Sequence, residues 1–464
     1  MAVRFYSDLP LPHERAALQE AVEKVLADRD GLWYVSITEP QHSLEWHVRV
    51  EGPGVRFSEV FFGSDQEDAD YIASRIRRAL APQPLIIRKF VISGFGPFAW
   101  TSMDLDPLTI FVGANGTGKT SLLELLRAIR EFVRTEIPPE IIPGWETREV
   151  YHRPGPDRLS WQLDLVAQDE EFSFTAEIVG VQGSQAIAEE TVLARAIKLN
   201  AMASLHRRGE SGTISDGVAG HVRPVRGRPN QLTLREYVNP SDRLLNRLKE
   251  QIDSWRFFSG IRFNDRQIRQ PALIEERPVL RDDGSNLASV LNWLQSAHNG
   301  IFRELELQIR GIIPAFRALS IRPTGAGRVT LTWEEEGFVN PLAAADLSDG
   351  SLRLLLWLTL AHVPNPPALV CIDEPEVGMH PRTLPKIAAL LKKLSTRTQV
   401  LIATHSSYLL AQFDVATVAV LQKRNGSIEF AKPASSAALV ENLREFGAEE
   451  LELMHRSDEL EALT

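Results

Sequence analysis

The sequence predicts an α/β fold built on a buried, largely parallel β-sheet, and three observations support this prediction. Short apolar runs, "LTIFV" at 108–112, "ALVCID" at 368–373 and "QVLIAT" at 399–404, alternate with segments of helical periodicity, as strands buried on both faces do. A glycine-rich loop, "GANGTGKT", joins the first run to a helix-forming segment. Two adjacent carboxylates, Asp373 and Glu374, end the second run, at the sheet edge where α/β proteins bind ligands.

Length and composition are those of an ordinary globular protein. With 464 residues, of which 44% are apolar and 24% charged, the chain is expected to form two or three lobes. Its single cysteine, Cys371, excludes a disulfide framework and a cysteine-based zinc site. The N-terminus lacks a signal-peptide pattern, and the most apolar stretch, Leu352–Ile372, is interrupted by Arg353 and His362. We therefore expect a cytoplasmic protein without a membrane span.

Charge is distributed unevenly along the chain, whose formal net charge is −10. Residues 195–281 contain 17 Lys and Arg residues against 9 Asp and Glu residues, a net charge of +8, so the remainder carries −18. The segment 441–464 holds eight acidic residues and two arginines. The basic middle region is either a solvated insertion or a surface that meets nucleic-acid phosphates.

The pattern of elements divides the chain into five regions. The first combines helical periodicity with alternating strands and predicts a small α+β domain to which no chemistry can be assigned. Residues 200–240 are rich in Gly, Ser, Pro and Arg and lack periodicity, which predicts loops or partial disorder. The predicted regions are an accessory domain at 1–83, a first lobe with the glycine-rich loop at 85–195, a basic, partly helical insertion at 196–345, a second lobe at 346–432 and an acidic helical tail at 433–464.

The glycine-rich loop is the strongest single signal. Residues Gly113–Thr120 match G-x-x-x-x-G-K-[ST] between an apolar strand and a helix, the context in which this pattern binds phosphate. The glycines let the backbone curl so that successive amides face a phosphate, and the helix start adds positive potential. Lys119 is expected to bridge β- and γ-phosphates, and Thr120 to ligate Mg²⁺. The residues predicted to contact the nucleotide are Asn115, Gly116, Thr117, Gly118, Lys119, Thr120 and Ser121.

Three polar side chains follow apolar runs further along the chain. Asp373 is expected to hold Mg²⁺ through water beside Thr120, and Glu374 to polarise the attacking water as general base. His405 can donate to the γ-phosphate and report its presence. Each has a plainer interpretation, a solvated acidic turn for the carboxylates and a structural role for the histidine. Their shared position at strand ends after a phosphate loop favours catalysis.

A second helix start, "LSDGS" at 347–351, precedes another apolar helix. Ser348 is a good N-cap, and Asp349 suits the positive end of the helix dipole. These roles explain why the helix begins here. They leave open what the free amides at its start bind.

These motifs, in this order, resemble those of ABC-type ATPases. The loop at 113–120, "LSDGS", "CIDEPEVGMHP" at 371–381 and "THS" at 404–406 correspond to Walker A, the signature, Walker B with the D-loop, and the switch histidine. "DEPE-x-G-x-H-P", with "RDDGSNLASVLNWL" at 281–294, is similar to the OLD/RecF-like soluble ATPases, which are related to SMC proteins and common in bacterial anti-phage systems. The resemblance covers about residues 85–432. It implies a P-loop NTPase fold with an ABC-type mixed sheet, and hydrolysis of ATP with Mg²⁺.

The resemblance also implies a role for "LSDGS". In this family the signature serine and glycine, here Ser348 and Gly350, contact the γ-phosphate held by the Walker A loop of a second subunit. Two chains then enclose two ATP molecules in a homodimer or larger homo-oligomer, and a capped helix start suits such an anion site. The motif departs from the usual LSGGQ, and Gln162 is the candidate for the Q-loop glutamine.

Two functional classes fit this resemblance. Family nucleases carry a metal-binding Toprim domain after the ATPase, but only about 30 residues follow Lys432, so we expect no nuclease activity in this chain. The first class is an ATP-switched sensor or scaffold of an anti-phage system that holds a separately encoded effector protein. The second is a RecF-like DNA-repair clamp whose basic region, 195–281, grips duplex DNA. A transporter ATPase fits less well, because no coupling segment is evident.

Overall fold

A computed structural model describes residues 2–7, 12–26, 32–38, 45–52, 55–62, 69, 72–73, 76, 84–197, 200–215, 222–236, 243–259 and 265–433. The predicted acidic tail beyond residue 433, and most of the predicted helix at 68–80, lie outside these residues. The chain divides into two compact units, one built mainly from residues 1–83 and the other from most of the remainder.

The N-terminal unit contains a four-stranded sheet and a helix that packs on it. Its elements are β1 (Ala2–Ser7), α1 (Pro12–Leu26), β2 (Leu32–Thr38), β3 (Glu45–Gly52) and β4 (Val55–Phe62). β1 pairs parallel with β2, and β3 and β4 continue the sheet antiparallel. Leu18 and Val22 of α1 and Trp33 and Ile37 of β2 belong to a hydrophobic core of this unit.

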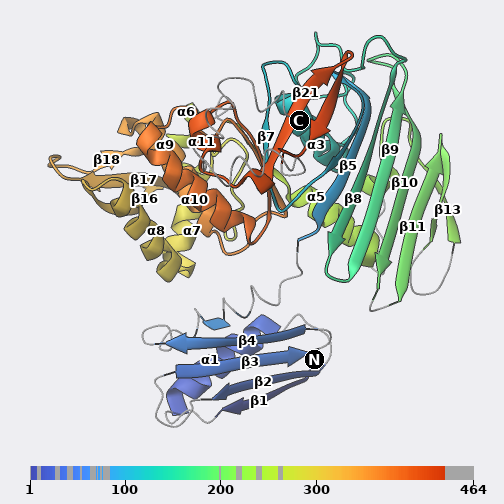
Figure 1. Cartoon of the computed structure of the whole chain (residues 1–464). Coiled ribbons are helices and arrows are strands. Elements are labelled where there is room, and N and C mark those ends of the chain that lie inside the picture. Colours follow the sequence, from blue (N-terminus) through green and yellow to red (C-terminus); the bar gives the residue numbers. More distant parts are fainter. Residues whose placement is uncertain are drawn as a thin grey trace. The chain divides into compact units, whose positions relative to one another are not determined.

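A six-stranded sheet forms the centre of the second unit, in the order β14-β19-β20-β7-β21-β22 (Figure 1). Its strands are β7 (Leu108–Val112), β14 (Arg256–Ser259), β19 (Leu369–Asp373), β20 (Gln399–Ala403), β21 (Val418–Arg424) and β22 (Ser427–Ala431). All pairings are parallel except that of β21 with β22. The predicted buried parallel sheet is therefore confirmed. With the glycine-rich loop after β7, it makes this a P-loop NTPase fold.

The chain after β4 also forms helices, one of which begins at the glycine-rich loop. They are α3 (Lys119–Arg134), α4 (Thr233–Glu236), α5 (Arg243–Ser254), α6 (Asp265–Ile268), α7 (Leu287–Ala297), α8 (Asn299–Ile312), α9 (Asp349–His362), α10 (Leu384–Ser395) and α11 (Ser407–Leu410). Phe132 of α3 packs against Trp161 of a second sheet, with ring centroids 5.9 Å apart. On its other side, Arg130 of α3 donates to the main-chain oxygen of Trp255, 2.9 Å away, just before β14. α3 is therefore fixed between two sheets.

The second sheet has eight antiparallel strands in the order β13-β12-β11-β10-β9-β8-β5-β6 (Figure 1). They are β5 (Ile86–Phe95), β6 (Phe98–Asp104), β8 (Arg158–Ala167), β9 (Glu170–Val179), β10 (Ala186–Ala196), β11 (Ala201–Arg208), β12 (Ser211–Ser215) and β13 (Val222–Arg226). β8 and β9 form the hairpin that their alternating sequences predict. Their apolar side chains alternate into the core that also receives α3.

The prediction of loops or partial disorder over 200–240 is wrong for most of its described residues, 200–215 and 222–236, because β11, β12, β13 and α4 lie there. A buried ion pair links these elements. Arg207 and Glu190 are both 0% exposed. Arg207 donates to the main-chain oxygen of Gln231 at 2.5 Å, and Glu190 accepts the amide of Thr233 at 2.6 Å. Such distant contacts give ordered structure to a segment without periodicity, and local composition does not encode them.

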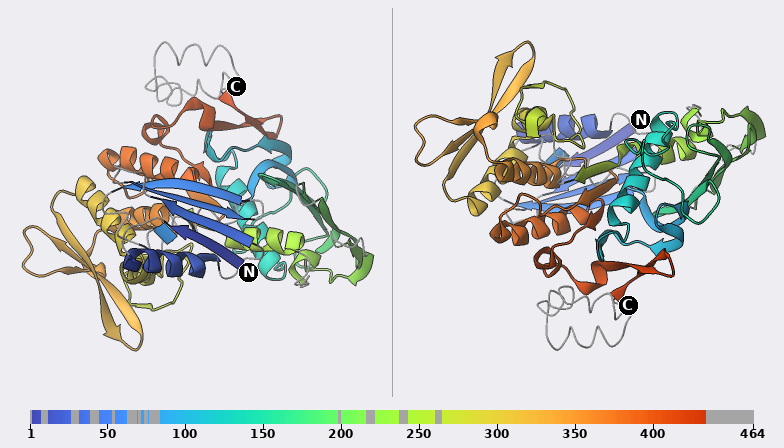
Figure 2. Two further views of the ribbon diagram at one scale, coloured as in Figure 1. Left: turned by 90° about the horizontal axis from the view of Figure 1, so that it is seen from below. Right: turned by 90° about the horizontal axis from the view of Figure 1, so that it is seen from above.

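A third, smaller sheet leads into the signature helix. Its strands are β15 (Ala272–Leu273), β16 (Phe316–Gly325), β17 (Arg328–Glu335) and β18 (Leu342–Ala343). Figure 2 shows the β16–β17 hairpin, in gold, extending away from the central sheet of this unit. A 3₁₀ turn, η2 (Ala344–Asp346), connects β18 to α9, while η3 (Pro381–Thr383) and η4 (Val415–Thr417) precede α10 and β21. Within the described part of the chain, no helix has the length and apolar character needed to cross a bilayer.

Candidate nucleotide-binding site

The loop between β7 and α3 has the geometry of a phosphate cradle. All five residues of β7 are buried, so the loop emerges from a fixed point in the sheet. Gly113 has a φ of 147°, and a Cβ there would lie 2.3 Å from the main-chain oxygen of Leu421. Gly118 has a φ of 85°, and a Cβ there would lie 2.9 Å from the Phe98 ring. Both positions therefore require glycine, for backbone conformation and for space.

Lys119 occupies the inside of this loop. The side chain is only 4% exposed, and its Nζ donates to the main-chain oxygens of Gly113 at 2.5 Å and Ala114 at 3.0 Å. At the start of α3, the N-cap residue is Gly118, which has no side chain to cap the helix, and the first turn contains no acidic residue. In this fully described segment, main-chain amides and an ammonium group converge where an anion would bind.

Thr120 and Asp373 meet at the edge of the parallel sheet. The Thr120 Oγ1 donates to the Asp373 Oδ2 across 3.0 Å, although 253 residues separate them in sequence. Burial raises the pKa of the Asp373 carboxyl to about 6, and the hydrogen bond from Thr120 opposes this shift. The prediction that these two side chains lie together is met by their geometry.

This pair of oxygen donors suits Mg²⁺. The described residues contain no group of three or more His, Cys, Asp or Glu side chains arranged to hold a metal. Mg²⁺ bound with a nucleotide does not need one, because it takes one or two protein oxygens and completes its shell with phosphates and water. Thr120 and Asp373 would hold the ion, and the ion would neutralise charge on the phosphates.

Glu374 follows β19 in a strained conformation. Its φ is 54°, a left-handed value that is uncommon for residues other than glycine. The strain is maintained by the hydrogen bond from the Glu374 amide to the main-chain oxygen of Ala403, at 2.8 Å, at the end of β20. Non-glycine residues in this region cost about 1–3 kcal/mol and cluster at functional sites. Glu374 is half-buried, beside the predicted metal ligand Asp373.

His405 is held near this strand end by a residue that the sequence analysis missed. The Glu376 Oε1 accepts a hydrogen bond from the Thr404 hydroxyl at 2.7 Å and another from the His405 amide at 3.3 Å. Burial raises the pKa of Glu376, and the hydrogen bond from Thr404 is the largest opposing effect. Glu376 is the second glutamate of "DEPE", so its position in the motif was the available signal. It joins the loop after β19 to the loop after β20.

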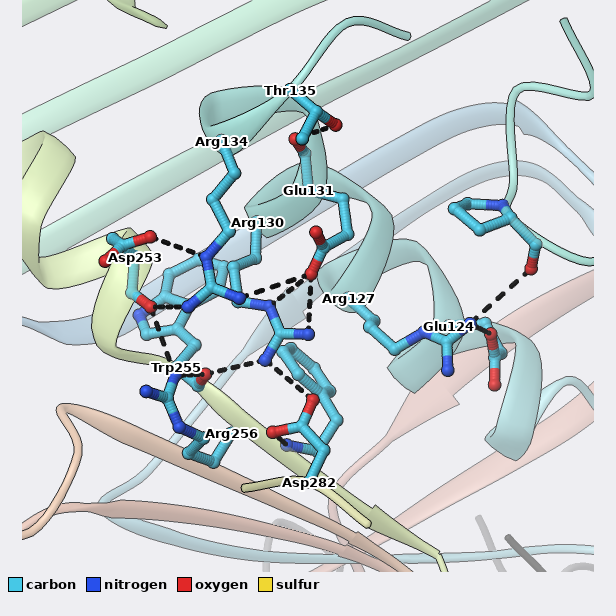
Figure 3. Close-up of polar contacts among 12 residues, drawn as sticks. Glu124, Arg127, Arg130, Glu131, Arg134, Thr135, Asp253, Trp255, Arg256 and Asp282 are labelled. Carbon is cyan, nitrogen blue, oxygen red and sulfur yellow. Dashed lines mark hydrogen bonds and ion pairs between the residues drawn. The ribbon is translucent and has the colours of Figure 1, made fainter. Parts of the chain in front are cut away.

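Arg130 fastens the "RDDGSN" segment beside α3 (Figure 3). Its Nη1 lies 2.8 Å from the Asp282 carboxylate, whose other oxygen accepts the Phe257 amide at 3.2 Å. Asp282 and Asp283 thereby line a cavity of about 220 Å³ that also borders Thr120 and Asp373. This segment, singled out by resemblance alone, lies next to the predicted metal ligands.

Gln162 does not lie at this edge. It belongs to β8 of the antiparallel sheet, where its Nε2 donates to both carboxylate oxygens of Asp164 at 3.0 Å. In the parallel sheet, the neighbours of β19 are β20 on one side and β14 on the other, so β8 does not belong to this sheet. The assignment of Gln162 to the Q-loop is therefore wrong, because proximity in sequence to the first helix did not reveal its sheet.

The "LSDGS" turn forms a second capped helix start. The Ser351 amide donates to the Ser348 Oγ at 3.1 Å, so the predicted N-cap is present. Ser348 is exposed. A Cβ on Gly350 would lie 3.0 Å from the main-chain oxygen of Gly378, which follows β19. The turn therefore packs against the loop after Walker B. Among the described residues, the hydroxyl of Ser348 is hydrogen-bonded to Ser351, not to the chain's own phosphate loop.

Two family models match parts of the sequence. Residues 225–411 match a model described as "AAA domain, putative AbiEii toxin, Type IV TA system", and residues 86–140 match a model described as "AAA ATPase domain". No curated protein matches the sequence.

Solved structures of SMC head domains are similar to this chain at low sequence identity. An SmcHead bound to the C-winged helix domain of ScpA is 12% identical with a TM-score of 0.48, covering 74% of this chain and 97% of that one. An Smc head with an extended coiled coil, bound to the C-terminal domain of ScpA and derived from Pyrococcus furiosus, is 12% identical with a TM-score of 0.46. The match covers 78% of this chain and 100% of that one. The SMC head domain from Thermotoga maritima is 14% identical with a TM-score of 0.39, and the match covers 75% of this chain and 98% of that one.

The general activity follows from the site and the matched models. A P-loop, a buried lysine and a hydrogen-bonded Thr–Asp pair occur together on a parallel sheet, and both models describe AAA domains, one of them an ATPase. Together they support an ATP-binding ATPase.

Proposed function

We propose that this chain is an ABC-type ATPase that encloses ATP between subunits and uses the nucleotide as an assembly switch. The observation that carries the proposal is the exposed, capped helix start at Ser348. Among the described residues, the Ser348 hydroxyl has no bond to the chain's own phosphate loop. The turn that carries it packs, at Gly350, against the loop after β19. A second anion-binding helix start on one chain is explained if it serves the nucleotide of another chain.

Each residue of the site then has a defined task. Lys119 and the amides from Asn115 to Ser121 bind the phosphates, and Thr120 and Asp373 hold Mg²⁺. Glu374 accepts the proton of the attacking water, while His405 donates to an oxygen of the γ-phosphate. Ser348 and Gly350 of a second copy complete the γ-phosphate contacts.

Nucleotide then controls assembly through differential affinity. ATP contacts two chains at once and stabilises the dimer, and removal of the γ-phosphate abolishes the contact to Ser348. The expected homodimer, or larger homo-oligomer, therefore forms with ATP and separates after hydrolysis.

Assembly is tested most directly by changing Ser348. Ser348→Glu should leave ATP binding to the isolated chain unchanged, because the residue is exposed and is not part of the Walker A loop. Its negative charge would face the partner's triphosphate, so we expect the dimer to weaken at least about 100-fold, since like-charge contacts cost several kcal/mol. Light scattering with a non-hydrolysable ATP analogue measures this. Ser184→Glu, on an exposed turn, is the control, and normal dimerisation of Ser348→Glu contradicts the shared site.

For the biological role, we propose a sensor or scaffold in anti-phage defence that holds a separately encoded effector. The supporting observation is the description of the model matched by residues 225–411, which names a type IV toxin–antitoxin system. The proposal predicts that the protein co-purifies with the product of a neighbouring gene, and that ATP hydrolysis changes this association.

A RecF-like DNA clamp is the second candidate, supported by the net charge of +8 over residues 195–281. Arg195, His206, Arg208 and Arg226 are exposed on the antiparallel sheet. Arg208 and Arg226 flank Ser211 on its two neighbouring strands, while Glu171 and Glu189 lie opposite Arg195 and Arg208. A clamp predicts ATP-dependent binding of duplex DNA that weakens steeply with salt, with a slope of about −0.9 per phosphate contact. Fluorescence anisotropy between about 50 and 200 mM salt measures this slope. Weak binding that is insensitive to ATP excludes the clamp.

A further inference from the structure

One arginine from outside the predicted motifs fastens the signature turn. Arg269 directly follows α6, and its guanidinium lies against the connection between β18 and α9. Its Nη1 donates to the main-chain oxygens of Ala344 at 3.0 Å, Ala345 at 3.1 Å and Leu347 at 2.5 Å. Its Nη2 forms an ion pair with the Asp349 carboxylate. One side chain therefore spans the whole connection, 75 to 80 residues away in sequence.

These contacts determine the conformation of the turn. Leu347 is extended, with φ −72° and ψ 147°, between the η2 turn and the helix start at Ser348. Main-chain carbonyls in such a connection have no repeating partner, so a side-chain donor decides which way they point. Arginine suits this task, because its planar guanidinium presents several donors in a fixed arrangement. The Arg269 side chain is only 20% exposed, so water competes weakly for these carbonyls.

Arg269 also offsets a charge at the proposed anion site. Asp349, 53% exposed, lies in the first turn of α9, where a carboxylate stabilises the helix dipole. The same carboxylate repels a triphosphate that approaches Ser348. The paired guanidinium supplies the opposite charge at hydrogen-bonding distance and reduces this repulsion.

We infer that Arg269 is a positioning residue that holds the signature turn in the conformation that binds ATP on another copy of the chain. This inference rests on the proposed function. Arg269 itself contacts the turn, whereas Ser348 and Gly350 would contact the nucleotide. The "RQIRQP" sequence around Arg269 matches no phosphate-binding pattern, and the assignment comes entirely from the tertiary contacts.

The test compares Arg269→Met with Arg266→Met, both in a Glu374→Gln chain that retains ATP. Arg266 is an exposed arginine of α6, three residues before Arg269, so its replacement removes the same charge from the same short segment. Arg269→Met should leave the affinity of the single chain for ATP within about twofold and raise the dimer dissociation constant about 10- to 100-fold, as expected from lost bonds to a charged group. Arg266→Met should change neither quantity.

A conservative variant separates positioning from a general effect on folding. Arg269→Lys keeps the charge beside Asp349 and at least one donor, so we expect it to recover part of the dimer affinity. Absence of any recovery contradicts the charge offset. If Arg269→Met loses both its affinity for ATP and its ability to dimerise, the inference is also overturned, because Arg269 would then support the fold rather than the turn.

The two proposals fail in different ways. If the Glu374→Gln chain with native Arg269 does not dimerise with ATP, the shared-site function is contradicted. If that chain dimerises, and Arg269→Met dimerises with the same dissociation constant, the shared site stands and the role of Arg269 is contradicted.

Discussion

Glu374→Gln should bind ATP normally, lose turnover and accumulate as an ATP-bound dimer. The amide cannot accept the proton of the attacking water, and general base catalysis contributes about 10²- to 10⁴-fold to such rates. The substitution preserves side-chain size and leaves the main-chain bond from residue 374 to Ala403 in place. Phosphate release measures turnover, and light scattering with Mg²⁺-ATP measures the dimer.

A glutamate outside the site provides the control for this result. Glu336 is exposed beside the β16–β17 hairpin, paired with Arg317, so Glu336→Gln should retain both turnover and monomer–dimer exchange. A Glu374→Gln chain that hydrolyses ATP at the native rate as a monomer would remove both the general base and the shared site.

Lys119→Ala should abolish nucleotide binding at micromolar concentrations. The ammonium group is buried inside the loop, where it bonds to the Gly113 and Ala114 oxygens and is positioned to neutralise the β- and γ-phosphates. Bonds to charged groups contribute about 1.5–3 kcal/mol each. Loss of the expected bonds from Lys119 to the two phosphates should therefore raise the dissociation constant for ATP about 100-fold or more. Titration with a fluorescent ATP analogue measures it.

An exposed lysine gives the comparison for Lys119. Lys386→Ala, on α10, removes one positive charge from the surface and should bind ATP as the native chain does. Retained affinity in Lys119→Ala, with the fold intact by circular dichroism, contradicts the Walker A assignment.

The parts of the proposed site that could be placed from sequence are those encoded by local patterns. An apolar strand, a glycine-rich loop and a helix-forming segment follow one another within Leu108–Arg134, so the phosphate cradle could be predicted from consecutive residues. Asp373 and Glu374 were found because strand ends in a parallel sheet meet at one edge. The structure supplies the contact itself, from Thr120 to Asp373.

The predictions that failed concern contacts between distant residues. Gln162 was assigned from its distance along the chain, but its strand belongs to the antiparallel sheet. Residues 200–240 carry the composition of loops because glycine, proline and arginine interrupt short strands. The buried Arg207–Glu190 pair holds that region in place, and arginine is otherwise typical of exposed positions.

By itself the sequence predicted the parallel α/β core and the glycine-rich loop, and it proposed side chains that could bind Mg²⁺ and activate water. Their signals lie within runs of a few residues, where strand and helix periodicity and glycine geometry leave a direct trace. Only the tertiary structure decided how the loops that carry them are held, through Glu376 at His405 and Arg269 at the signature turn. Most of these bonds go to main-chain atoms, which every residue carries, so they leave little trace in the sequence of the contacted segment. The exceptions are the Thr404 hydroxyl and the Asp349 carboxylate.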